Sequence, residues 1–148
     1  MAFDKKLLYW YIYDAPKSKI VQDITAEYIK AFITSNNIAF VATQPRLSVP
    51  IILRICKKMS HSIRFAEIKV CDNLIIDGHH RYLSALLMDF ELGQVSSDST
   101  SATKEIAWDL VEFDEEDWDT PAKVAYLNEL DAKYNDLELD FVKQITSG

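Results

Sequence analysis

The sequence contains few glycines and cysteines and no long apolar run. Its 148 residues include three glycines and two cysteines. Cys56 and Cys71 lack CxxC spacing and an accompanying histidine pattern, so we expect two reduced thiols rather than a zinc site. No apolar stretch reaches about 18 residues, and the apolar segment near the N-terminus lacks a small-residue cleavage site. We therefore expect no membrane span and a cytoplasmic location.

The chain also lacks an excess of basic residues. Its formal net charge is −7 and its sequence pI is near 4.9. Because nucleic-acid phosphates select basic surfaces, we expect no direct DNA binding. Acidic residues are concentrated from Asp109 to Asp119. Two interpretations are open for this segment: a solvated face, or a surface that docks a basic protein.

Length and periodicity favour one α/β (α+β) domain over residues 1–148. With 49% hydrophobic residues, the chain can bury a core. Period-two segments alternate with segments of helical spacing, which predicts a mixed sheet flanked by helices. The predicted strands are Leu7–Tyr13, Ile38–Thr43, Phe65–Val70, Leu74–Ile76 and Glu105–Phe113, and the predicted helices begin after Thr25, at Pro50, after Asp77 and at Pro121. The type of the last apolar segment, 137–145, stays open.

The stretch Leu74–Phe90 combines apolar, flexible and chargeable residues in a defined order. Its first residues suit a buried strand, and its later apolar residues recur at helical spacing. Asp77 stands where a side chain can cap the helix, and Gly78 permits a sharp turn. We also expect Gly93 to end this helix as a C-cap.

His79, His80 and Arg81 fall in the first turn of that helix. Free backbone N–H groups and the helix dipole favour an anion there. Two imidazoles and a guanidinium added to them predict a phosphate or carboxylate receptor. His79 is also in register with Leu83, so a hydrogen-bonded histidine under the core is an equal alternative for this residue. Adjacent histidines diverge around a helix, so we expect no metal ion held by the pair.

The hairpin Phe65–Ile76 and the Asp-Gly-His-His-Arg sequence from Asp77 to Arg81 resemble the ParB/sulfiredoxin-like superfamily. A helix at Pro50–Met59 precedes them, as it does in that superfamily. The resemblance covers residues 48–113 and is sharpest around residues 75–82. It implies a small α/β domain whose turn holds nucleotide phosphates.

By position, the resemblance implies that Gly78, His80 and Arg81 contact the phosphates of ATP or CTP bound with magnesium, and that His79 lies in the same turn. Sulfiredoxins carry their reactive cysteine at the position of His79, so their reductase chemistry is not expected here. The arginine-rich turn and separate DNA-binding domain of chromosome-segregation members are also missing.

Some superfamily members are free-serine kinases, which implies a small-molecule phosphotransferase as one function. Phosphoryl transfer needs neutralised phosphates, a carboxylate-held metal and a base near the acceptor hydroxyl. Glu67 and Asp77 are the nearest carboxylates in sequence and are the candidate catalytic residues. Asp77 is equally explained as a helix cap, and Glu67 as a solvent-facing strand residue. Whether the protein is an enzyme stays open.

The alternative function is a non-enzymatic binding protein. A short acidic chain suits an immunity or antitoxin protein that neutralises a basic partner. Its contact surface would combine the acidic segment with the aromatic residues Trp108 and Trp118.

Overall fold

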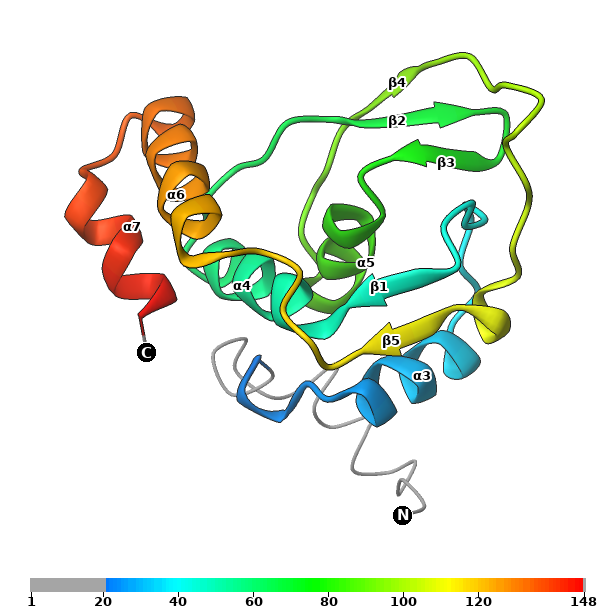
Figure 1. The fold of residues 1–148 in the computed structure, drawn as a ribbon, viewed down its shortest axis with the longest axis horizontal. Coiled ribbons are helices and arrows are strands. Elements are labelled where there is room, and N and C mark those ends of the chain that lie inside the picture. The colour runs from blue at the N-terminus through cyan, green and yellow to red at the C-terminus, as the bar shows by residue number, and fades with distance from the viewer. Residues whose placement is uncertain (1–20, 148) are drawn as a thin grey trace.

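The computed structural model describes residues 21–147, which form a mixed α/β domain (Figure 1). The helices are α3 (Ala26–Ser35), α4 (Val49–Ser60), α5 (His79–Met88), the 3-10 helix η2 (Trp108–Leu110), α6 (Pro121–Asn135) and α7 (Leu139–Thr146). The strands are β1 (Arg46–Ser48), β2 (Ile68–Cys71), β3 (Leu74–Asp77), β4 (Gln94–Ser96) and β5 (Glu112–Asp114). The predicted α/β class is confirmed, and the predicted strand Leu7–Tyr13 lies outside the described residues. None of the helices in this part of the chain has the length and hydropathy needed to cross a membrane.

Two small sheets lie on opposite sides of α5 (Figure 1). In the first, β2 pairs antiparallel with β3 and parallel with β4, so the sheet is mixed as predicted. The turn between β2 and β3 contains Asp72 with a positive φ of 53°, and the predicted hairpin is confirmed. In the second, β1 and β5 pair in parallel. Isolated bridges at Val41 and Ala42 connect the segment before β1 to β3 and to Ile106.

Several predicted strands are shorter than expected or different in kind. Ile38–Thr43 forms only the two isolated bridges, and Phe65–Val70 becomes regular only at Ile68. The predicted strand Glu105–Phe113 is interrupted by η2 and resumes as β5. The alternation of buried residues also breaks at η2, where Leu110 is 69% exposed and the next residue, Val111, is buried instead. Strand β4 was not predicted, because its three residues are all exposed.

The helix boundaries agree better with the sequence predictions than the strand boundaries do. Thr25 and Thr120 are N-caps whose hydroxyls accept from Tyr28 N and Lys123 N, as expected for threonine before a helix. The segment left open after residue 136 is helix α7. The expected C-cap at Gly93 is wrong, because α5 ends earlier, at Asp89 in the left-handed region with φ 49°. Asp tolerates this conformation better than most residues.

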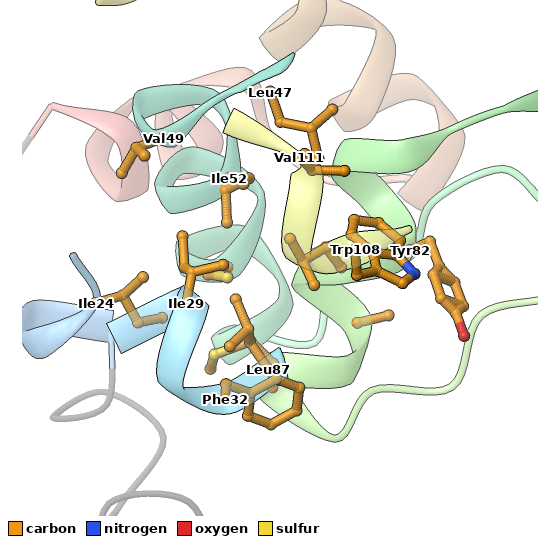
Figure 2. Close-up of a cluster of buried hydrophobic side chains, with 14 of the residues drawn as sticks. Ile24, Ile29, Phe32, Leu47, Val49, Ile52, Tyr82, Leu87, Trp108 and Val111 are labelled. Atoms are coloured by element: carbon orange, nitrogen blue, oxygen red, sulfur yellow. The ribbon is translucent and has the colours of Figure 1, made fainter. Parts of the chain in front are cut away.

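Helix α5 is the centre of the main core and packs against α4. Leu83 on α5 and Ile52 on α4 have no exposed surface. Tyr82 and Trp108 stack with their ring centroids 6.4 Å apart, and Figure 2 shows the two rings side by side. Both rings also hold the backbone of Phe40, since Trp108 Nε1 donates to its carbonyl and Tyr82 Oη accepts from its amide. The core therefore fixes α5 against three separate segments of the chain.

Helices α6 and α7 form a separate end of the molecule (Figure 1). A second, smaller core of Ile63, Ala132, Val142 and Ile145 joins them to the loop after α4. Asn135 on α6 bonds both backbone groups of Arg64, accepting from its N at 2.7 Å and donating to its O at 2.9 Å. This part of the fold thus depends on few apolar side chains and on specific polar contacts.

Replacing Leu83 with Ala removes a fully buried side chain from α5 and should lower the free energy of unfolding by about 2–5 kcal/mol. Leu110→Ala is the matched control, because Leu110 is 69% exposed, and its effect should stay within about 0.5 kcal/mol. Urea unfolding measures both values. Equal effects of the two substitutions would contradict the position of α5 in the core.

Candidate functional site

The turn between β3 and α5 is built around Gly78. This residue is the N-cap of α5 and has a positive φ of 98°, which glycine adopts without strain. A Cβ atom at this position would lie 2.7 Å from Ile68 Cγ2 and 2.8 Å from Arg81 Nη2. Both the backbone conformation and the available space therefore require glycine, and the predicted sharp turn is confirmed.

Asp77 does not cap the helix, so that interpretation of this residue is wrong. No side chain accepts from the first amides of α5. Asp77 is the last residue of β3, its side chain is 65% exposed, and its Oδ2 lies 3.4 Å from Arg81 Nη2. Because Gly78 takes the N-cap position itself, the Asp77 carboxylate precedes the cap and is directed to Arg81 instead. The N-terminal amides of α5 are therefore not satisfied by a capping side chain.

His79 is buried under the core, with only 4% of its surface exposed. Its Nε2 accepts a hydrogen bond from the backbone N–H of Thr43 at 2.9 Å, which places the ring proton on Nδ1. Burial lowers the pKa of His79 to about 4, although the negative charge of Asp77 partly opposes this shift. The alternative of a hydrogen-bonded histidine beneath the core accordingly describes the position of this side chain.

His80 makes the same kind of contact with a different segment. Its Nε2 accepts from the backbone N–H of Ser48 at 2.9 Å, and its ring meets Trp118 edge-on with centroids 5.5 Å apart. Burial and, to a smaller extent, the neighbouring His79 lower its pKa to about 4, although the Asp119 carboxylate opposes this shift. Both histidines are therefore neutral at pH 7. Among the residues that the structure describes, neither Nδ1–H has a hydrogen-bond acceptor.

Arg81 joins the turn to the segment before β2. Its Nη1 donates to the carbonyl oxygens of Ala66 at 2.8 Å and Glu67 at 3.3 Å, while Nη2 faces Asp77. The side chain is 22% exposed. Arg81 thus lies beside Gly78 and reaches the same surface as the α5 N-terminus, as the predicted anion receptor requires.

Glu67 lies in the exposed segment before β2, and its Cγ is near the backbone of Gly93. Within residues 21–147 its carboxylate makes no ion pair, although its carbonyl oxygen accepts from Arg81. Asp77 and Glu67 therefore both contact Arg81, one through its carboxylate and the other through its backbone. The described residues contain no cluster of three or more His, Cys, Asp or Glu side chains suited to a metal ion.

Several carboxylates of the acidic segment form ion pairs with arginines of the same domain. Arg54 bonds Asp117 at 2.5 Å and Asp119 at 3.2 Å, and Arg46 bonds Asp114 at 2.8 Å. Hydrogen bonds from Arg54 hold the pKa of Asp117 below its usual range. The interpretation of this whole segment as one solvated or docking face is therefore too simple.

Trp108, directly before the acidic segment, and Trp118, within it, have different environments. Trp108 belongs to the core, so the expectation that it contributes to a contact surface is wrong. Its indole N–H explains its inward position, since it donates to Phe40 O. Trp118 is 40% exposed and is held by a hydrogen bond from its Nε1 to Asp114 Oδ2 at 3.1 Å. Only the second tryptophan remains available to a partner.

Thr43 and Ser48 are neighbours of the histidines that the sequence did not indicate. They contact the histidines through backbone N–H groups, and the hydroxyl of Thr43 also donates to Ile75 O at 2.5 Å. Backbone donors can belong to almost any residue type, so no sequence signal marks them. Residues 43–48 lie against the turn because the tertiary structure brings their backbone N–H groups to the two histidine rings, not because of their residue types.

The two neutral histidines predict a stability that depends on pH. Their folded pKa values lie near 4 and an unfolded histidine titrates near 6.5, so the unfolded chain binds more protons between these values. The free energy of unfolding should be highest above about pH 6.5 and fall as the pH drops to 4, by about 2 kcal/mol per ring after allowance for solvent contact. Urea unfolding across this range measures the slope.

His79→Gln should reduce that slope, because the glutamine carbonyl can accept from Thr43 N without titrating. His61→Gln is the control, since His61 is exposed and lies outside the turn. An unchanged slope in the His79 variant would contradict the assignment of a neutral imidazole.

Comparison with known proteins adds no identification to this geometry. No family model, no curated protein and no solved structure matches the chain. The resemblance in the Asp77–Arg81 turn therefore stays a prediction, and the functional argument depends on the side chains themselves.

Proposed function

We propose that this domain binds the phosphates of a nucleotide, ATP or CTP, at the N-terminus of α5. The observation that carries the proposal is the uncapped start of this ten-residue helix behind a left-handed glycine. Unsatisfied N–H groups and the positive end of the helix dipole favour an anion at this place. A phosphate oxygen there would take the role that a capping side chain has at α3 and α6.

The histidines support the proposal as neutral donors rather than as cations. Each Nε2 is occupied by a backbone N–H, which keeps the proton on Nδ1. An imidazole held in one tautomer can donate to a phosphate oxygen without a cost for reorienting the ring. The fixed tautomer would therefore give His80, whose ring is only partly buried, a defined donor role at pH 7, whereas His79 is buried under the core.

Arg81 supplies the positive charge. Its carboxylate partner, Asp77, is mostly exposed and 3.4 Å away, so this is a weak pair. A phosphate can replace or share this partner, because a guanidinium has five N–H donors and binds phosphate in two-pronged geometry. The hydrogen bonds to Ala66 and Glu67 would keep the side chain positioned during this exchange.

The carboxylates of Asp77 and Glu67 extend the proposal to phosphoryl transfer. Magnesium usually binds proteins through one or two carboxylates together with substrate phosphates. Asp77 is beside Arg81 and would hold the ion, and the unpaired carboxylate of Glu67 would accept the proton of a hydroxyl substrate.

If this extension is correct, Asp77→Asn and Glu67→Gln should abolish ADP formation from ATP but leave nucleotide binding within about threefold.

Nucleotide binding should raise the melting temperature of the protein. At a concentration one hundred times Kd, a ligand stabilises the folded state by about 2.7 kcal/mol. Differential scanning fluorimetry with millimolar ATP or CTP and magnesium measures this shift. Arg81→Met should lower the nucleotide affinity at least about tenfold, because it removes the charge beside the helix N-terminus.

Arg46→Met is the matched control for that experiment. Arg46 also pairs with an aspartate and is exposed, but it belongs to β1 and does not contact the turn. Its loss should leave nucleotide affinity unchanged. The proposal would be rejected if neither nucleotide shifts the melting temperature, or if Arg81→Met binds as tightly as the native protein.

A second function, a non-enzymatic binding protein, is favoured by the surface of α6 and α7. Five large apolar side chains there are at least 37% exposed: Tyr126, Leu130, Tyr134, Leu137 and Phe141. Exposed aromatic and aliphatic side chains near acidic ones suit a protein interface. Glu115 and Glu116 are exposed and make no ion pair among the described side chains, so they retain charge for a basic partner.

This second function predicts a complex with a basic protein, such as the product of an adjacent gene. Tyr134→Glu with Phe141→Glu should weaken that complex at least about tenfold in an isothermal titration, because hot spots are commonly aromatic. Leu110→Glu, an equally drastic change on η2, should not. Failure of purified basic candidates to bind the native protein would exclude this function.

A further inference from the structure

A cavity of about 460 Å³ lies between α4, α6 and the Arg81 side chain. Its walls are mainly aliphatic and aromatic, from Ile51, Ile55, Phe65, Val124, Leu127, Leu130 and Tyr134. Five charged side chains complete the lining: Arg54, Lys58, Arg81, Asp119 and Asp131. Small-molecule sites typically have about 300–1,000 Å³ and such apolar walls with a few polar groups.

Polar contacts between the two helices hold the cavity open. Lys58 on α4 pairs with Asp131 on α6 at 2.5 Å, and Arg54 on α4 pairs with Asp119 immediately before α6 at 3.2 Å. Asn135 fixes the end of α6 to the backbone of Arg64. These contacts set the spacing of α4 and α6, so the apolar walls cannot close on one another without breaking them. The space is therefore a preformed feature of the fold.

Lys58 points to the chemistry of the ligand. Its side chain is 6% exposed, and an ammonium group has three N–H donors. Among residues 21–147 its Nζ has one acceptor, Asp131 Oδ2. Buried donors are nearly always hydrogen-bonded in proteins. The Lys58 ammonium, in contrast, has more N–H donors than acceptors among the described residues. An oxygen atom of a ligand in the cavity would supply one.

The remaining N–H donors of Lys58, and not the net charge of the lining, favour a ligand with a strong acceptor. Arg54, Lys58 and Arg81 give three positive charges against two negative charges from Asp119 and Asp131. Arg54 also pairs with Asp117, and Arg81 with Asp77, so both guanidinium groups already have carboxylate partners. Lys58, which still has N–H donors without an acceptor among the described residues, is therefore the group of the lining that a ligand would contact, and carboxylates bind ammonium groups through strong hydrogen bonds.

We propose that the cavity between α4 and α6 binds a compact apolar monocarboxylate, with its aryl or alkyl body between the helices and its carboxylate at Lys58. The carboxylate contact at Lys58 does not rest on nucleotide binding, because Lys58, Asp131 and Leu127 do not belong to the Gly78–Arg81 turn, although Arg81 lines the cavity as well. A nucleotide would need several phosphate donors, and most of this cavity is apolar. The volume holds a molecule with one aromatic ring and a short chain.

Phenylbutyrate is a suitable probe, and the uncharged phenylbutanol is its matched analogue. Titration of the full chain is followed through the methyl resonances of Ile51, Ile55 and Val124. Phenylbutyrate should shift these resonances saturably, with Kd below about 1 mM, and phenylbutanol should bind about tenfold more weakly. Lys58→Met should remove this preference, because methionine keeps the packing and lacks the ammonium.

Leu127→Trp keeps the experiment decisive if the Lys58 variant does not fold. The larger side chain fills the space between the helices and should abolish binding of both probes, whereas Leu110→Trp, far from the cavity, should change nothing. The proposal is overturned if the shifts do not saturate, if phenylbutanol binds as tightly as phenylbutyrate, or if Leu127→Trp retains affinity. It is also overturned if the resonance of exposed Leu137 shifts as much as those of the lining, since binding would then be nonspecific.

Discussion

The structure depends on two hydrogen bonds in which histidine rings accept from the backbone. His79 and His80 are adjacent, yet they bond Thr43 and Ser48, which begin and end the segment that leads into α4. A backbone donor withdrawn from water without a partner costs about 1–3 kcal/mol. The pair therefore fixes the position of this segment against α5, and with it β1, β5 and the start of α4. Both bonds require the neutral ring, which connects folding to protonation.

The same bonds determine what the turn can do chemically. A pair of imidazolium groups would attract an anion through charge, but burial keeps these rings neutral. In the phosphate binding that we propose, recognition would depend on directed N–H donors, the uncapped amides of α5 and the single charge of Arg81. Directed donors favour phosphate oxygens of defined geometry over anions in general.

Ion pairs join the helices and strands to the segments that connect them. The acidic segment neutralises Arg46 and Arg54 and so holds the chain between β5 and α6 against β1 and α4. Lys58 and Asp131 extend this pattern between α4 and α6. Such partly buried pairs contribute specificity of position more reliably than stability. Here they join α4 to α6 and to the segment before α6, beside the cavity that Arg81 also lines.

Local sequence determined the helices, the β2–β3 hairpin and the glycine turn, because caps, periodicity and positive φ are properties of neighbouring residues. It also identified Gly78 and Arg81 as neighbours at the start of α5. Asp77 is no cap because its neighbour Gly78 takes that position. Only the tertiary structure decided that Trp108 is buried and that both imidazoles are acceptors. Those outcomes depend on contacts with Phe40, Thr43 and Ser48, more than thirty positions away in the sequence. Burial and hydrogen-bond partners at that separation are set by packing, which no local pattern encodes.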